Sequence, residues 1–214
     1  MRKPQLASLE TSDHLRADSR YPTRVGITGS PGTGKKSVGL ELARISGLDL
    51  LQINDFAKEK EFGIVDDKEF IVDVKLVRRS IDPRDKIVCG HLLPYVIPKS
   101  KIDFVAILRC SPRVLRKRYL ERKYSEPKIK ENIEAEMIGV IASKALEIYG
   151  KSKLGEFDTS KTTPAVVARR IIETLKGNRK PEFGKIDWLS SQSSSQELIE
   201  HSKSHSKSIK DNYG

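Results

Sequence analysis

A short glycine-rich stretch near the start of the chain carries the residue types that phosphate chemistry needs. It contains Gly29, Gly32 and Gly34 and ends on Lys35, so it fits the pattern Gly-x-x-x-x-Gly-Lys. Glycine adopts backbone angles that other residues resist, which lets neighbouring N–H groups turn inward around phosphate oxygens. An apolar run precedes the turn and helical spacing follows it, so a helix dipole adds positive potential at the same point. The stretch therefore predicts a nucleotide-binding loop in which Lys35 meets the outer phosphates.

The position after the lysine departs from the usual pattern, which has serine or threonine there as a ligand of Mg²⁺. Lys36 occupies this position, and Ser37 follows one residue later. A protonated lysine has no lone pair to offer a metal ion. Either Ser37 takes over as the ligand, or phosphate oxygens and water hold the magnesium ion. The residues leave both alternatives open.

A strongly basic segment, residues 109–130, is the second candidate for phosphate chemistry. Pro112 suits the first turn of a helix, and Arg118 and Arg122 are four residues apart, so they share one helix face. Two guanidinium groups on one face can clamp a phosphate chain. The alternative, a solvated basic helix, is the weaker interpretation because a phosphate loop is present in the same chain.

His91 directly follows an apolar run, residues 86–90, that predicts a core strand. In open α/β sheets, ligands bind in the crevice outside the carboxyl ends of the strands, where such a polar residue lies. A functional histidine and a structural one, bonded to the backbone at the strand end, are equally favoured by the residues alone.

Strand-like and helix-like patterns alternate along the chain and predict an α/β domain. Short apolar runs predict strands at 23–28, 48–53, 86–90, 102–108 and 155–159. Helical spacing predicts helices at 35–46, 125–149 and 164–176. The charged residues 54–81 predict a small insert with short helices. This insert either covers a second substrate or is a solvent-exposed helical segment that binds no ligand.

Apolar spacing within the predicted helix 125–149 indicates a core-facing stripe rather than a cofactor site. The stripe consists of Ile129, Ile133, Met137, Val140, Ile141 and Ile148. Further along the chain, Trp188 and Leu189 are expected to dock on the core. Gly47 is expected to cap the C-terminus of the first helix.

Composition limits the class of protein. The formal net charge of +11 favours nucleotides, nucleic acid or acidic partners. Cys89 and Cys110 lie in or beside apolar runs, so we expect buried free thiols in a reducing cytoplasm. No apolar run reaches membrane-spanning length, and the N-terminus lacks the apolar region of a signal peptide. Residues 1–22 and 190–214 predict a flexible extension and a disordered tail, in which His201 and His205 make no convincing metal site.

Taken in order, these pieces resemble a nucleoside monophosphate kinase, and more narrowly the adenylate kinase isoenzyme 6 family, also called Fap-seven, especially its archaeal members. The resemblance covers about residues 23 to 189. The segment 108–126, which includes Arg118-Tyr119-Leu120-Glu121-Arg122, is its most specific part. The other matching stretches are 28–35, Gly90-His91-Leu92-Leu93-Pro94, 130–136, Phe157-Asp158-Thr159 and Ile186-Asp187-Trp188-Leu189.

The resemblance implies an α/β P-loop NTPase fold, in which helices flank a parallel sheet within a domain of residues 23–189. A small monophosphate-binding insert would span residues 52–75, and a short helical lid would span about 121–131. The implied reaction is Mg²⁺-dependent phosphoryl transfer between ATP and AMP or a related monophosphate. The family also implies an ATPase activity in maturation of the small ribosomal subunit and its rRNA, with transient binding of a small-subunit ribosomal protein.

The resemblance also assigns residues. The ATP phosphates would be held by Gly32, Gly34, Lys35, Lys36 and Ser37, with Gly29 as a helper. Arg122 would close over them from the lid, helped by Arg118, and His91 matches the histidine of the family's Asp-x-His element. Cys89 stands where that element has its acidic residue, and a thiol orders magnesium-bound water poorly. Two other hypotheses remain: an ATP-driven ribosome assembly factor with incidental kinase turnover, and a kinase of another small acceptor.

Overall fold

Five parallel strands form the centre of the computed structural model, which describes residues 22–66 and 69–190. The strands are β1 (Arg24–Thr28), β2 (Asp49–Gln52), β5 (Lys86–Cys89), β6 (Phe104–Arg109) and β7 (Leu154–Asp158). Their order across the sheet is β2-β5-β1-β6-β7, so β1, which leads into the glycine-rich loop, lies in the middle. Every residue of β6 is buried, as expected for a parallel strand covered on both faces.

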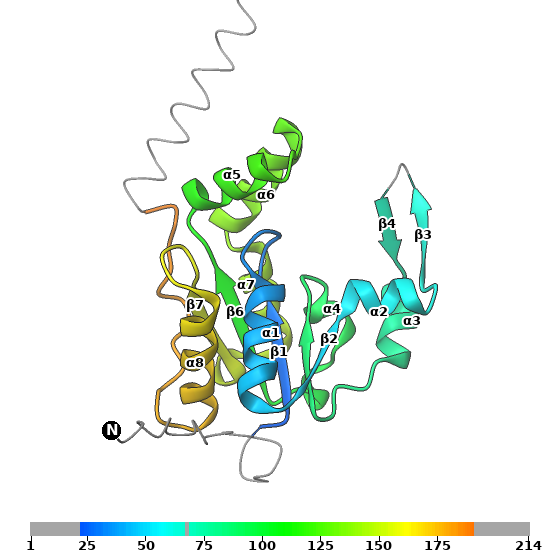
Figure 1. Cartoon of the computed structure of the whole chain (residues 1–214), viewed down its shortest axis with the longest axis vertical. Coiled ribbons are helices and arrows are strands. Elements are labelled where there is room, and N and C mark those ends of the chain that lie inside the picture. Colours follow the sequence, from blue (N-terminus) through cyan, green and yellow to red (C-terminus); the bar gives the residue numbers. More distant parts are fainter. Residues whose placement is uncertain (1–21, 67–68, 191–214) are drawn as a thin grey trace, which may run out of the picture.

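Helices cover both faces of this sheet (Figure 1). On one face, α1 (Lys35–Ser46) and α8 (Pro164–Leu175) pack on alternate residues of the strands, such as Val25 and Ile27. On the other face, α4 (Leu93–Val96) and α7 (Val140–Tyr149) pack on the intervening residues, such as Val105 and Ile107. Short 3-10 turns, 99–101 and 151–153, precede β6 and β7. The predicted α/β fold with a helix-flanked parallel sheet is confirmed.

Two antiparallel helices, α5 (Pro112–Glu121) and α6 (Glu126–Met137), project above the carboxyl end of the sheet (Figure 1). They enclose a small core of their own, made of Cys110, Leu115, Tyr119, Ile129, Ile133 and Met137. The turn between the helices contains Lys123 in a left-handed conformation, φ 58°, which glycine adopts freely and lysine does not. This helical pair contains the segment 121–131, for which the lid was predicted.

The segment after β2 differs from the prediction of short helices alone. It contains α2 (Ile53–Glu59), an antiparallel hairpin of β3 (Gly63–Asp66) and β4 (Glu69–Val72), and α3 (Val74–Ser80). The strand predicted at 48–53 is also shorter, since Ile53 already begins α2. On the hairpin, Ile64 is 67 % and Val65 74 % exposed, while Phe70 and Val72 of β4 are partly buried against the core. Because these two strands bury little apolar surface, no alternating pattern marked them in the sequence.

The single helix predicted at 125–149 is wrong. Gly139 takes a left-handed conformation, φ 67°, and breaks the segment into α6 and α7. The break changes the helical phase, so α7 buries Ala142, Ala145 and Tyr149 and leaves Val140 40 % exposed. The predicted core stripe therefore holds at Ile129, Ile133 and Met137, fails at Val140, and holds again at Ile148, which is partly buried against the core.

The remaining predictions about packing have mixed outcomes. Gly47 caps α1 as predicted, with its N–H bonded to the carbonyl of Ala43. Cys89 and Cys110 are buried free thiols. Trp188 packs against the core of the helical pair, but Leu189 is 50 % exposed and does not dock.

Some predictions concern parts of the chain that lie outside the described residues. These are the flexible extension and the disordered tail, apart from residues 22 and 190, and the pair His201 and His205. Within the ranges that the structure does describe, no helix combines the length and the apolar character needed to cross a membrane.

Candidate functional site

The glycine-rich loop forms an open cradle between β1 and α1. Gly34 is the N-cap of α1, which begins at Lys35. Gly29 and Gly32 have φ values of 139° and 78°, and a Cβ at either would also collide with neighbours. At Gly29 it would lie 2.3 Å from the carbonyl oxygen of Leu108, and at Gly32 2.7 Å from the ring of Tyr119. Backbone conformation and close packing both require glycine here, which leaves the loop amides at the helix N-terminus for an anion.

Lys35 lies folded over this loop. Its Nζ donates hydrogen bonds to the carbonyl oxygens of Gly29 (2.9 Å) and Ser30 (2.8 Å). The pKa of Lys35 is lowered to about 8, mainly by burial and in part by the positive charge of Arg122, while Cys89 and Glu136 act in the opposite direction. The ammonium group is therefore charged at pH 7 and is held at the loop, where a phosphate would replace its two carbonyl partners.

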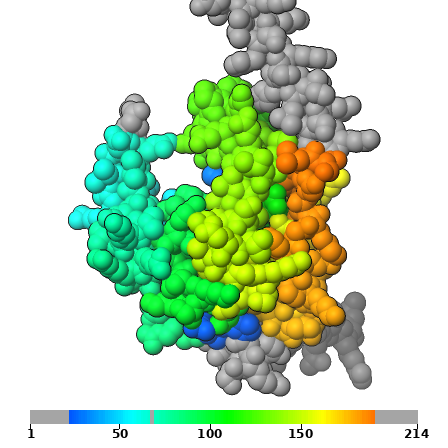
Figure 2. Space-filling model, turned by 180° about the vertical axis from the view of Figure 1, so that it is seen from behind, coloured from blue at the N-terminus to red at the C-terminus, as the bar shows by residue number. Residues whose placement is uncertain are grey.

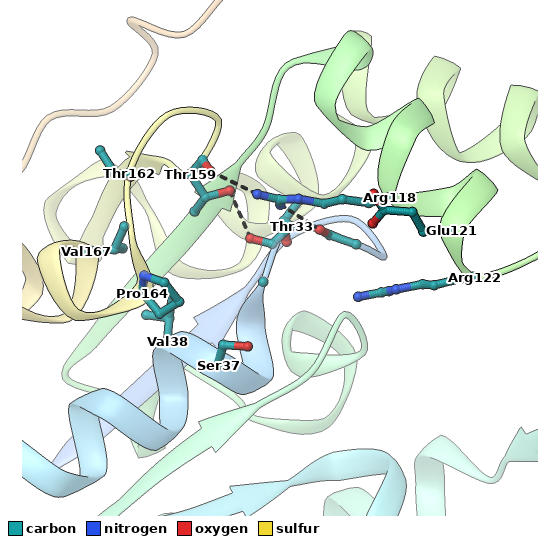
Figure 3. A pocket seen from close by; sticks show the side chains of 12 residues that line it. Thr33, Ser37, Val38, Arg118, Glu121, Arg122, Thr159, Thr162, Pro164 and Val167 are labelled. Carbon is teal, nitrogen blue, oxygen red and sulfur yellow. Dashed lines mark hydrogen bonds between the residues drawn. The ribbon is translucent and has the colours of Figure 1, made fainter.

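The helical pair is fastened to the loop through two side chains of α5. The hydroxyl of Tyr119 donates to the carbonyl of Pro31 (2.6 Å). The guanidinium of Arg118 donates to the carbonyls of Gly32 (2.9 Å) and Thr159 (3.1 Å). Arg118 thus ties the lid, the loop and the end of β7 together (Figure 3). This contact places it beside the predicted phosphate site, with its guanidinium already bonded to main-chain oxygens.

Arg122 has a different environment. It lies at the C-terminal end of α5, one helical turn beyond Arg118, and its side chain is exposed. Among the described residues its guanidinium has no hydrogen-bond or ion-pair partner, and it extends over the cavity below the lid (Figure 3). Its positive charge is one of the causes that lower the pKa of Lys35. Of these two arginines, Arg122 is the one available for an incoming anion.

A cavity of about 300 Å³ separates the loop, the lid and the start of α8 (Figure 3). Its polar side is formed by the loop, Ser37, Arg118, Glu121, Arg122, Thr159 and Thr162. Its apolar side is formed by Val38, Pro164 and Val167. The arrangement can hold a molecule with an anionic end at the loop and a flat or apolar end against α8.

Two of the predicted residues, Cys89 and His91, lie at the carboxyl end of β5. His91 is half-buried there, and burial together with the charge of Lys35 lowers its pKa, so the imidazole is neutral at pH 7. Burial raises the pKa of Cys89 to about 11, so this thiol keeps its proton. Lys36 and Ser37 are both exposed at the start of α1. Cys89 and His91 thus share one strand end, whereas Ser37 lines the cavity below the helical pair.

The donor set fits a magnesium ion that is held mainly through phosphates. The protonated thiol of Cys89 and the ammonium of Lys36 do not ligate metal, whereas the hydroxyl of Ser37 can. In the part of the chain that the structure describes, no three histidine, cysteine or acidic residues are grouped to hold a metal. Mg²⁺ commonly keeps several waters and binds through few protein ligands plus substrate phosphates, which agrees with one hydroxyl here.

A buried cluster of charges beside the loop was not predicted. Arg109 is 4 % and Glu136 2 % exposed, and Arg109 Nε lies 2.8 Å from Glu136 Oε1. Arg109 Nη1 lies 2.7 Å from Glu156 Oε1. One signal could have revealed the cluster: Glu136 follows Ile129 and Ile133 at helical spacing, which places a carboxylate on the buried face of α6.

Comparison with known proteins agrees with this geometry. A family model described as "AAA domain" matches residues 25–139. A "Putative adenylate kinase" from Archaeoglobus fulgidus is 39 % identical over 78 % of this chain and 92 % of that protein. A protein of the same name from Pyrococcus abyssi is 34 % identical over 77 % of this chain and 90 % of that protein.

Solved structures share the fold. A shikimate kinase from Acinetobacter baumannii, in complex with shikimate, superposes with a TM-score of 0.53 over 78 % of this chain and 99 % of that chain. A shikimate kinase from Bacteroides thetaiotaomicron gives 0.51 over 72 % and 99 %. Sequence identity is 16 % in both cases, so the similarity concerns the fold alone.

Proposed function

This chain belongs to the P-loop, nucleoside monophosphate kinase-like family of those archaeal relatives, and on that premise we propose that it is an adenylate kinase-type enzyme that converts ATP and AMP into two ADP. The observation that carries the proposal is that a lysine, an arginine from the helical pair and a cavity all adjoin the same glycine-rich loop. Lys35 lies on the loop, Arg122 extends over it, and the cavity has a polar and an apolar side.

The triphosphate of ATP would occupy the cradle, where loop amides and the α1 N-terminus face its oxygens. The adenosine would extend into the cavity between the lid and α8, against Val38, Pro164 and Val167. The acceptor monophosphate would bind on the opposite side, near His91 and the insert 52–75, with its phosphate in line with the transferred group. The neutral imidazole of His91 would orient a phosphate oxygen there.

Phosphoryl transfer mainly requires alignment of the two oxygens and neutralisation of the charge that develops on the transferred group. Lys35, with a pKa of about 8, would leave its carbonyl partners and follow the outer phosphates. Arg122 would approach from the lid as the charge develops. The Ser37 hydroxyl, together with the phosphates, would hold Mg²⁺, which would supply further positive charge. No side chain needs to form a covalent bond to phosphorus.

A coupled assay of ADP formation across AMP, CMP, GMP and UMP tests this proposal. We expect ADP formation from AMP, whether or not other monophosphates are also accepted. Failure to phosphorylate any of the four, by protein that binds ATP, would refute monophosphate kinase activity. A second panel of small hydroxyl acceptors would then test the alternative of another kinase.

The second candidate is an ATPase that drives maturation of the small ribosomal subunit, with kinase turnover as a side reaction. Support comes from the net charge of +11 and from exposed basic side chains on α5, Arg113 and Lys117. ATP hydrolysis measured with and without AMP separates the two candidates. Hydrolysis that RNA or a small-subunit ribosomal protein stimulates, without ADP formed from AMP, would favour this second role.

A further inference from the structure

The carboxylate of Glu136, on α6, joins the phosphate loop to two other segments, the end of β6 and the residues around Trp188. Its Oε2 accepts a hydrogen bond from the hydroxyl of Ser30 in the loop (2.7 Å). Its Oε1 accepts from Arg109 Nε (2.8 Å), from the backbone N–H of Cys110 (3.1 Å) and from the indole Nε1–H of Trp188 (3.1 Å). Both oxygens are thus used, and the carboxylate is fixed in one orientation.

Ser30 connects Glu136 to Lys35 through hydrogen bonds. Ser30 is 1 % exposed, and its hydroxyl is bonded to Glu136. Its carbonyl oxygen accepts from Lys35 Nζ (2.8 Å) and from the hydroxyl of Thr33 (2.9 Å). A shift of Ser30 would therefore move one of the two carbonyls that hold the ammonium, and with it the curvature of the loop.

The segment that carries Trp188, residues 182–188, is here called the C-terminal strap. It runs along the edge of the molecule beside β7, orange in Figure 2. The carbonyl of Glu182 accepts from the N–H of Glu156 (2.7 Å), and the N–H of Gly184 donates to the Glu156 carboxylate (2.7 Å). The strap is therefore bonded to the edge strand at one end and to Glu136 at the other.

We propose that Glu136 and Trp188 are positioning residues for the phosphate loop. Trp188 of the strap fixes the carboxylate of Glu136, this carboxylate fixes the hydroxyl of Ser30, and the carbonyl of Ser30 fixes the position of the Lys35 ammonium group. Neither Glu136 nor Trp188 is among the residues that line the cavity proposed for the nucleotide. The inference rests on the proposed nucleotide site at this loop. On this inference the strap contributes to nucleotide binding, although its residues lie far from the loop in the sequence.

Trp188 is the one tryptophan of the chain, so its fluorescence reports on the strap directly. We expect ADP binding to change the emission of Trp188 in the wild-type protein. Ser30→Ala removes the link to Glu136 and should abolish most of this change at saturating ADP. An emission that stays constant while calorimetry shows ADP binding to the wild type would overturn the inference.

Trp188→Phe removes the indole donor and keeps an aromatic ring. We expect it to weaken ADP binding in calorimetry about tenfold, within the range for coupled neighbouring groups. The matched control is Leu189→Ala, since Leu189 is adjacent but 50 % exposed, and should keep the wild-type Kd. If Trp188→Phe does not fold, as judged by thermal unfolding, the fluorescence comparison of wild type and Ser30→Ala decides.

A double-mutant cycle separates positioning from general destabilisation. Because both variants act through one carboxylate, Trp188→Phe should change the Kd for ADP little further in the Ser30→Ala background. Additive effects, or a wild-type Kd in folded Trp188→Phe, would overturn the inference. A wild-type protein that does not bind ADP would instead refute the proposed function, so the two failures are distinguishable.

Discussion

Replacing Lys35 with alanine should remove most of the phosphoryl transfer activity. The ammonium group is half-buried and is held within hydrogen-bond distance of two loop carbonyls, the position that a phosphate oxygen would share. A unit charge about 4 Å from a phosphate charge, at the effective dielectric constant of a protein surface, contributes about 4 kcal/mol. If this attraction acts on the charge that develops in the transition state, its loss corresponds to roughly a 10³-fold lower kcat/KM.

The measurement is a coupled assay with ATP, AMP and Mg²⁺, at concentrations that give kcat and kcat/KM separately. Lys101→Ala is the matched control, because Lys101 is an exposed lysine on a 3-10 turn that precedes β6, away from the carboxyl end of the sheet. This control should keep wild-type kinetics. A Lys35→Ala variant that remains folded and retains kcat/KM within about tenfold of the wild type would refute the role given to the loop lysine.

Three further outcomes are expected. Arg122→Ala should lower kcat by about 10²-fold or more with a smaller change in KM, because it removes positive charge offered to the transition state. The control Lys117→Ala, on the exposed face of α5, should keep the wild-type kcat. A kcat of Arg122→Ala equal to that of the wild type at saturating substrates would contradict the role given to Arg122. Because the pKa of Lys35 is about 8, the ammonium group loses its proton as the pH rises through that value. The affinity for ADP, measured by calorimetry, should therefore be constant near pH 7 and fall above about pH 8. An affinity that stays constant to about pH 9 would contradict the role of Lys35 in phosphate binding. Gly139→Ala should lower stability by about 1 kcal/mol in thermal unfolding, since φ is 67° at the break between α6 and α7, and an unchanged melting temperature would show that the break tolerates a side chain.

The nucleotide loop and its neighbours could be predicted because their physical requirements are local. Positive φ angles select glycine at Gly29, Gly32 and Gly34, and the helix that must follow starts at Lys35, as the residue pattern indicated. The position of Arg118 and Arg122 on one helix face follows from their spacing alone. Such features depend on a few consecutive residues, so one sequence suffices to find them.

Features that depend on distant partners could not be read from the sequence. The hairpin of β3 and β4 is held by backbone pairing between the two strands and contributes Phe70 and Val72 to the core only in part, so its charged sequence reads as a loop. Gly139 lies inside an apolar helical pattern, and the change of phase it causes is visible only when α7 is packed on the sheet. Helical spacing places Glu136 on the buried face of α6, but its partners Arg109 and Trp188 come from other segments, and that spacing does not identify them.

The central claim is that main-chain amides and one lysine at the end of β1 hold the phosphates of ATP. Isothermal titration of purified wild-type protein with ATP or ADP in magnesium buffer tests this claim most directly. We predict saturable binding with one triphosphate site per chain at the glycine-rich loop, lost on changing Lys35 to alanine. An absence of measurable binding of either nucleotide to folded protein would contradict the account.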